Sequence, residues 1–164
     1  MTMTPPSPRV DEQWSALAAR LQRCALGLTR STDKADDLVQ ETIARLLSRG
    51  GEHSEAYAIT TLTRLWLAHE RSWRRRLALL RRRALPARET RQPDESLDIQ
   101  ARLQRLEIAI AALPPRQRAV LVLRCVEGLD SAAVAAALDC DVQTVRAHLH
   151  LARQRLRSMF GESA

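Results

Sequence analysis

Residues 129–157 read LDSAAVAAALDCDVQTVRAHLHLARQRLR, which is the pattern of a helix-turn-helix. Asp130 can cap a first, Ala-rich helix through its side-chain oxygen, and residues 139–141 form a short polar break. A second helix is expected from Gln143 to Arg157. Its apolar residues recur on one stripe, formed by Val145, Leu149, Ala152 and Leu156. This stripe can pack on the first helix and hold the two helices at a fixed angle.

The opposite face of the second expected helix is polar and basic. Residues 143–157 contain four Arg and no acidic residue. Side chains of this kind suit base edges and phosphates in the major groove of DNA. The candidates for DNA contact are Gln143, Thr144, Arg146, Ala147, His150 and Arg153. The segment therefore indicates a DNA-reading element, whereas Arg155 and Arg157 could simply lie at a solvated helix end.

Composition favours an all-α protein with aliphatic cores, because Ala, Leu and Arg dominate the 164 residues and aromatic side chains make up only 3%. We expect two small helical domains joined by a flexible linker, each marginally stable alone. The net charge of +7 is unevenly placed: residues 71–91 hold nine Arg against one Glu. Such a patch attracts a polyanion, and nucleic acid is favoured over a membrane surface or a merely solvated linker.

Breaks in the apolar pattern suggest where the domains lie. Residues 1–9 contain three prolines and are expected to be a disordered lead-in. Helical spacing then runs through residues 10–83, and the proline-containing, mixed-charge segment 84–96 is the expected linker. Residues 97–160 form the expected C-terminal domain with the helix-turn-helix. Without a signal peptide or long apolar span, the chain is expected to be cytoplasmic and not inserted in a membrane.

The sequence offers little support for catalysis or metal binding. It lacks a Gly-rich phosphate loop and paired-Cys zinc spacing, so we expect no catalytic residues, no metal and no cofactor. Cys125 lies in the apolar run AVLVLRCV and is predicted to be buried. Cys140 lies in a turn, where a redox role is conceivable, and its only nearby ligand candidates are His148 and His150. These two histidines point apart on a helix, which disfavours a metal site.

Two segments together resemble the extracytoplasmic-function sigma factors, a short, two-domain class of the bacterial sigma-70 family. Residues 113–157 resemble the C-terminal promoter-reading domain of that class. The matching residues there include Leu113-Pro114, Val120–Leu123, Glu127-Gly128-Leu129, Thr144-Val145 and Ala152-Arg153. Residues 35–42, ADDLVQET, are similar to the most recognisable N-terminal motif of the family. The two matches occur in the order and at about the spacing of the family.

The resemblance implies an RNA polymerase sigma factor that directs core polymerase to specific promoters. Residues 10–83 would then be a region 2-like domain that binds core RNA polymerase and opens the −10 element. Residues 97–160 would be a region 4-like domain that reads the −35 element. Core polymerase and promoter DNA are the implied partners, together with an anti-sigma factor that covers the same surfaces. Polymerase performs the chemistry, so the resemblance implies no enzyme activity in this chain.

In ADDLVQET the resemblance implies a helix that docks on a coiled coil of the largest polymerase subunits. The implied polymerase-binding residues are Asp36, Asp37, Leu38, Gln40 and Glu41. Carboxylates on this helix can pair with Arg side chains of the partner. Alternatively, the acidic residues could serve only to stabilise the start of the helix, because carboxylates interact favourably with the positive end of the helix dipole.

Residues 57–76 occupy the place of the promoter-melting helix, and here the match is poorest. The family usually has Trp-Leu, Asn and Asp before paired Arg, where this chain has Tyr57-Ala58, Arg64, Ala68 and Arg71-Ser72. Recognition of the −10 element is therefore expected to be altered or weakened. The candidates for phosphate contact at this element are Arg64, Arg71, Arg74 and Arg75. Trp66 and Trp73 line up with apolar residues at helical spacing, which favours the core over base stacking.

Two departures in the C-terminal segment leave alternatives open. Ala133 replaces a Glu that would complete a capping box, and Gln143 replaces the usual Gly. Gln143 could read an adenine edge or be an exposed substitution without a reading role. At the level of function, a sigma-like decoy that binds an anti-sigma factor and a stand-alone helix-turn-helix regulator remain alternatives. The latter leaves ADDLVQET unexplained.

Overall fold

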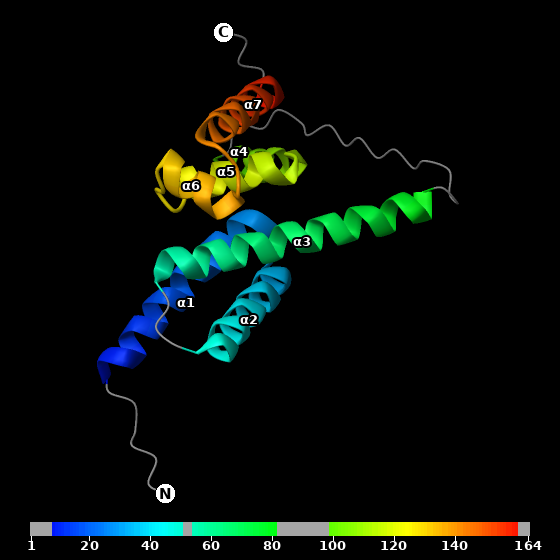
Figure 1. The fold of residues 1–164 in the computed structure, drawn as a ribbon. Helices are drawn as coiled ribbons and strands as arrows, with labels where there is room; N and C mark the ends of the chain where they lie inside the picture. The colour runs from blue at the N-terminus through cyan, green and yellow to red at the C-terminus, as the bar shows by residue number, and fades with distance from the viewer. Residues whose placement is uncertain (1–7, 51–53, 82–98, 161–164) are drawn as a thin grey trace, which may run out of the picture.

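The computed structural model describes residues 8–50, 54–81 and 99–160, so the expected linker lies outside the described residues. Within these ranges the chain forms helices and no strand. In chain order the helices are α1 (Pro8–Thr29), α2 (Thr32–Arg49), α3 (Glu55–Arg81), α4 (Ile99–Ala112), α5 (Pro115–Cys125), α6 (Ser131–Leu138) and α7 (Val142–Phe160). The predicted all-α class is confirmed (Figure 1).

Local chemistry explains where the helices begin and end. Gly50 follows α2 with a φ of +65°, a left-handed value that glycine adopts without a steric cost. Pro115 occupies the first turn of α5, where a missing N–H breaks no helical hydrogen bond. The Asp130 carboxylate caps α6 by accepting a hydrogen bond from the Ala133 N–H at 2.7 Å. The Asp130 cap predicted from the sequence is confirmed, and the other two ends have equally local causes.

Helices α1 to α3 pack on one another and form what we call the N-terminal lobe. Its core consists of aliphatic side chains such as Leu21, Leu46 and Leu62, which are almost fully buried. Helix α1 begins at Pro8, two residues before the expected start of the first domain. The acidic start of α2 and the Arg-rich part of α3 therefore belong to the same packed three-helix unit.

Helices α4 to α7 form the C-terminal lobe, in which α7 packs on α5 and α6. Val145 and Ala152 of α7 are fully buried, and Leu149 and Leu156 are half-buried. The predicted apolar stripe thus faces the lobe. Cys125 was predicted to be buried, and this is wrong: it is exposed at the end of α5. The inward face of α5 is formed instead by residues such as Val122 and Leu123.

The two lobes are in direct contact. Helices α5 and α6 lie across α1 and α3, with α7 on the far side of α5 and α6 (Figure 1). One continuous cluster of buried side chains extends from α1 to α7 and includes Leu28, Leu62, Val120 and Leu138. The sequence predicts two lobes and a linker, but it gives no sign that the lobes share a core.

Candidate functional site

The outer face of α7 is the first candidate surface. Gln143, Arg146, Ala147, His150 and Arg153 are all exposed on it. The buried stripe of α7 packs on α5 and α6, and the five exposed side chains lie outside that stripe. Figure 1 shows α7 itself on the side of α5 and α6 that faces away from the N-terminal lobe. This face has no acidic residue from position 143 to position 157. It can therefore contact the base edges and phosphates of a DNA duplex without charge repulsion.

Thr144, the sixth predicted DNA-contact residue, has a structural role at the start of α7. Its N–H donates to the Asp141 carboxylate at 2.6 Å, and its hydroxyl donates to the same group at 2.9 Å. These bonds lower the pKa of Asp141 below its usual range, because they stabilise the charged carboxylate. Thr144 is half-buried and already committed to this cap, so it has less capacity for DNA than its neighbours.

The basic side of α3 is the second candidate surface. Arg71, Arg74 and Arg75 are exposed, and Arg74 lies 3.9 Å from Glu70 one turn earlier. Arg64 is placed differently from these three. Its Nε donates to the Ala137 carbonyl at 3.0 Å, and a terminal nitrogen donates to the Ala136 carbonyl at 3.1 Å. Both carbonyls belong to α6, so Arg64 is bonded to the C-terminal lobe.

The two tryptophans of α3 lie in different environments. Trp66 is 3% exposed, and the guanidinium of Arg118 lies 5.5 Å from its ring centre. Trp73 is 59% exposed. The prediction that both belong to the core is therefore right for Trp66 and wrong for Trp73. Seven residues are close to two helical turns, so the spacing alone does not distinguish the buried Trp66 from the exposed Trp73.

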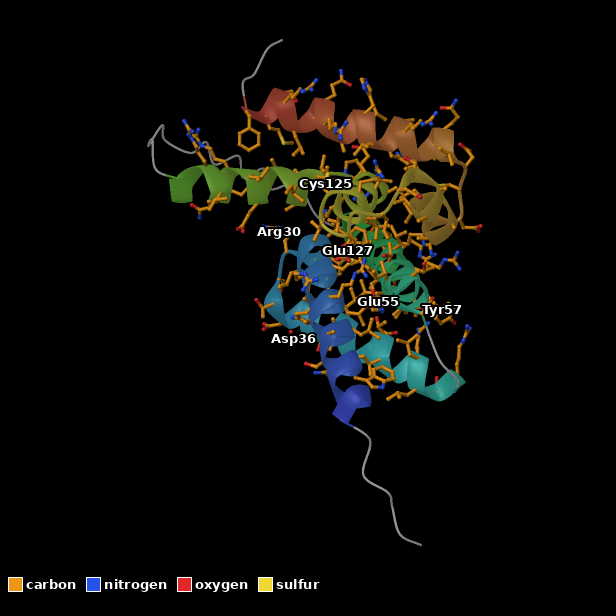
Figure 2. All side chains as sticks on the ribbon, turned by 90° about the vertical axis from the view of Figure 1, so that its left-hand side faces the viewer. Arg30, Asp36, Glu55, Tyr57, Cys125 and Glu127 are labelled. Atoms are coloured by element: carbon orange, nitrogen blue, oxygen red, sulfur yellow. The ribbon has the colours of Figure 1, made fainter. Side chains whose placement is uncertain are left out.

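The acidic start of α2 is the third candidate surface. Asp36, Asp37 and Gln40 are exposed, and Gln22 of α1 donates to Asp36. Glu41 is half-buried and accepts from Arg45 at 2.9 Å and lies 3.1 Å from His69. Figure 2 shows Asp36 on the side of the N-terminal lobe that faces away from Tyr57.

Leu38 does not reach this surface. It is 2% exposed and belongs to the core of the N-terminal lobe, so it packs beneath α2 and offers almost no side-chain area to a partner. In the motif ADDLVQET, Leu38 is therefore an inward-facing residue of an amphipathic helix whose acidic residues face outward.

Two hollows beside these surfaces were not foreseen from the sequence. One, of about 390 Å³, is lined by Asp37, His69, Glu70 and Trp73 among others, next to the acidic start of α2. The other, of about 540 Å³, lies between the end of α2 and the start of α3. Its polar lining includes Arg45, Arg49, Tyr57, Thr60 and Arg64. These residues come from two helices and share no sequence motif, so only the fold brings them together.

The remaining candidate chemistry is weak. Among residues 8–50, 54–81 and 99–160, no group of three or more His, Cys, Asp or Glu is placed to hold a metal ion. Burial raises the pKa of the Cys140 thiol, the opposite of what a reactive thiolate needs. No helix in these ranges is long and apolar enough to cross a bilayer.

Comparisons with known proteins agree with the motif resemblance. Residues 103–156 match the family described as Sigma-70, region 4. The chain is 32% identical over 160 residues to the ECF RNA polymerase sigma factor SigE of Mycolicibacterium smegmatis, covering 92% of this chain and 61% of that protein. It is 28% identical over 149 residues to the ECF RNA polymerase sigma factor EcfG of Rhodopseudomonas palustris, covering 88% and 81%. The chain thus spans about three fifths of the length of SigE.

The fold also has a counterpart among solved structures. The sigma factor RpoE from Bartonella quintana, solved in complex with the anti-sigma factor NepR, superposes with a TM-score of 0.70. The match covers 96% of this chain and all of that chain at 22% identity, and it supports the same helical fold. The region 4 match and the relatives along most of the chain agree in supporting an extracytoplasmic-function sigma factor of the sigma-70 family.

Proposed function

We propose that this chain is a promoter-recognition subunit of bacterial RNA polymerase, without enzyme activity of its own. One observation carries the proposal: a single chain of this family exposes an acid-free basic face on α7 in one lobe and an acidic face on α2 in the other. The first surface suits DNA and the second suits a basic protein partner. A chain that joins the two can bring polymerase to a DNA sequence.

The α7 face is the proposed reader of the −35 element. Arg146 and Arg153 can each reach base edges or phosphates from the exposed side of the helix, and Gln143 lies at its start, where recognition helices contact bases. His150 and Ala147 lie between them and would fill the groove. Thr144 would contribute through its hydrogen bonds to Asp141, which fix the first turn of the helix.

The α3 face and the adjoining 540 Å³ hollow are the proposed −10 surface. Arg71, Arg74 and Arg75 would contact the strand backbone, and Arg64 would join them once it is released from α6. A polar hollow next to a row of Arg side chains suits an unstacked base beside its backbone. Because the residues in this segment depart from the family pattern, the preferred −10 sequence should differ from that of relatives.

The acidic face of α2 is the proposed dock for core polymerase. Asp36, Asp37, Gln40 and Glu41 present oxygens that can accept hydrogen bonds from Arg side chains of the partner. An anti-sigma factor is the second proposed partner. The solved structure of RpoE in complex with NepR supports this proposal, since that sigma factor has the same fold.

Run-off transcription tests the function directly. Purified chain would be added to sigma-free core polymerase on the DNA upstream of its own gene, and a discrete transcript that depends on the chain is expected. Binding to core without a transcript from this DNA or from a promoter library would contradict promoter recognition and favour a decoy that sequesters a partner. Failure to bind core would favour a stand-alone DNA-binding regulator.

The docking surface has its own test. Asp37→Arg combined with Glu41→Arg reverses two charges on α2 and should abolish co-elution with core polymerase, because attraction becomes repulsion. Circular dichroism should show the wild-type helix content. Gln104→Arg is the control, since it adds a positive charge at an exposed position on α4 of the other lobe and should leave co-elution intact. Co-elution of the double variant would remove the docking assignment.

A further inference from the structure

A hollow of about 390 Å³ lies where the three helices of the N-terminal lobe meet, beside the acidic start of α2. Helix α2 contributes Lys34 and Asp37 to its lining, and α3 contributes Trp66, Glu70 and Trp73. We call this feature the Trp73 hollow. The proposed −10 surface uses a different hollow, at the end of α2, so the proposed function gives the Trp73 hollow no role.

Trp73 lies on the opposite side of α3 from the arginines proposed to contact DNA. Each residue of an α-helix turns the chain by about 100°, so Arg64, Arg71 and Arg75 fall on one row along α3. By the same count Trp73 falls about 180° away from this row. Glu70 lies on the Trp73 side and lines the same hollow. Trp73 is therefore placed for a ligand at the start of α2, and not for a base of a strand that follows the Arg row.

The lining of the Trp73 hollow suits a cation. Trp73 is 59% exposed, although tryptophan side chains are highly buried on average. The Glu70 carboxylate lies 3.9 Å from the Arg74 Nε, which is too far for a hydrogen bond, so Glu70 can still accept one. Asp37 adds a second, exposed carboxylate. An indole face attracts a cation within about 6 Å of its ring centre, and an adjacent carboxylate can pair with the same charge.

The two basic side chains of the lining leave this chemistry available. Lys34 is exposed, and its flexible stem can carry the ammonium group into water. The His69 Nε2 lies 3.1 Å from a carboxylate oxygen of Glu41, so His69 already has an acidic partner. The aromatic face of Trp73 and the Glu70 carboxylate can therefore meet a cation that comes from outside the chain.

Arginine fits this lining better than lysine. A guanidinium group is planar, so it can stack on the indole ring while its forked N–H groups pair with a carboxylate. Trp66, on the same side of α3, shows this stacking within the chain, because the Arg118 guanidinium lies 5.5 Å from its ring centre. Asp37 belongs both to the acidic face of α2 and to the Trp73 hollow. A basic partner that docks on α2 can therefore place an arginine in the hollow.

We propose that the Trp73 hollow is a socket for an arginine side chain of core polymerase, which stacks on Trp73 and pairs with Glu70 when polymerase docks on the acidic face of α2. This inference rests on the proposed function, since it names a side chain that binds beside the proposed docking surface. The socket adds a contact from α3 to a surface that otherwise belongs to α2. Stacking and pairing at one guanidinium require a defined angle, so the socket also orients the N-terminal lobe on polymerase.

Affinity for core polymerase tests the socket, measured by fluorescence anisotropy of the labelled full chain. Trp73→Leu keeps an apolar side chain but removes the aromatic face, so Kd should rise about 2- to 30-fold, the range of a lost cation–π contact. Trp73→Phe keeps a weaker aromatic face and should give an intermediate Kd. Trp14→Leu is the matched control, because it makes the same change at an exposed tryptophan of α1, about 22 Å along the helix from Thr29 at the hollow. An unchanged Kd for Trp73→Leu would overturn the socket.

A second measurement tests the socket without polymerase. The indole N–H resonances of the full chain are followed by NMR while N-acetyl-arginine amide is added at constant ionic strength. The Trp73 resonance, assigned with Trp73→Phe, should shift saturably with this probe and not with N-acetyl-citrulline amide, which has a similar shape without the charge. Absence of an arginine-specific shift at Trp73 would overturn the socket, even in a chain that binds core and supports transcription. The shift in a chain that never binds core would contradict the proposed function and the polymerase as the source of the arginine, but not the arginine site.

Discussion

The two basic surfaces of this chain, on α7 and on α3, differ in how they are held. The α7 face is built within one helix-turn-helix, with its apolar stripe buried and its Arg side chains exposed. The α3 face lies beside the other lobe, and Arg64 on this face donates hydrogen bonds to the carbonyls of Ala136 and Ala137 in α6. A surface made by local structure is available whenever the helix is folded. A surface that lies where the two lobes meet is available only in some arrangements of the lobes.

The largest effect on DNA binding is expected from the α7 face. Arg146→Ala combined with Arg153→Ala should weaken binding by roughly 1–3 kcal/mol for each base edge that is no longer read, and by less for each phosphate. The helix should stay folded, because both side chains are exposed. Fluorescence anisotropy of holoenzyme on a promoter fragment measures the change in affinity.

The matched control for this pair is Arg155→Ala combined with Arg157→Ala. It removes the same charge near the C-terminal end of the same helix, where the two side chains are also exposed. We expect this control pair to decrease the affinity for DNA less than the Arg146 and Arg153 pair does. Its effect should be purely electrostatic, so that added salt weakens wild-type binding in the same way. Equal decreases for the two pairs would show that α7 supplies charge without reading bases.

Substitutions on the α3 face are expected to weaken DNA binding less than those on α7. Comparing two of them should show whether the bonds of Arg64 to the other lobe compete with DNA. Arg75→Ala removes an exposed cation and should weaken holoenzyme binding with a decrease of about 1 in the salt slope for one phosphate contact. Arg64→Ala should weaken binding less overall, because it also removes two bonds that keep the lobes together. Salt titrations of promoter binding by the two variants give both quantities. Identical decreases would argue that α6 does not compete for Arg64.

The sequence predicts the parts of the molecule whose causes are local. The Asp130 cap, the glycine after α2, Pro115 at the start of α5 and the buried stripe of α7 each depend on residues within a few positions of one another. The candidate residues on the α7 face also lie where the pattern predicts, apart from the more buried Thr144.

The contact between the lobes was not predictable in this way. Arg20 and Glu127 are 107 positions apart, and nothing in their surroundings marks them as partners. Gly27 resembles any helical glycine until Val122 is placed against it. The wrong predictions have the same origin. Whether Cys125 and Trp73 are buried depends on how far neighbouring helices extend over them, which periodicity alone does not give.

The smallest expected effect concerns the support of the α7 face. The Asp141 carboxylate accepts two hydrogen bonds from Thr144, which lower its native pKa below the value of about 3.9 expected in the unfolded chain. A lowered pKa stabilises the fold above the unfolded value, and this contribution is lost as the pH falls through the native pKa. Asp141→Ala should therefore lower Tm modestly at pH 7, and the difference from wild type should narrow toward about pH 3. Thermal melts followed by circular dichroism at the two pH values measure it. A Tm difference that stays constant would mean that the carboxylate charge does not stabilise the start of α7, and the orientation of the recognition face would then rest on the burial of Val145 and Ala152 alone.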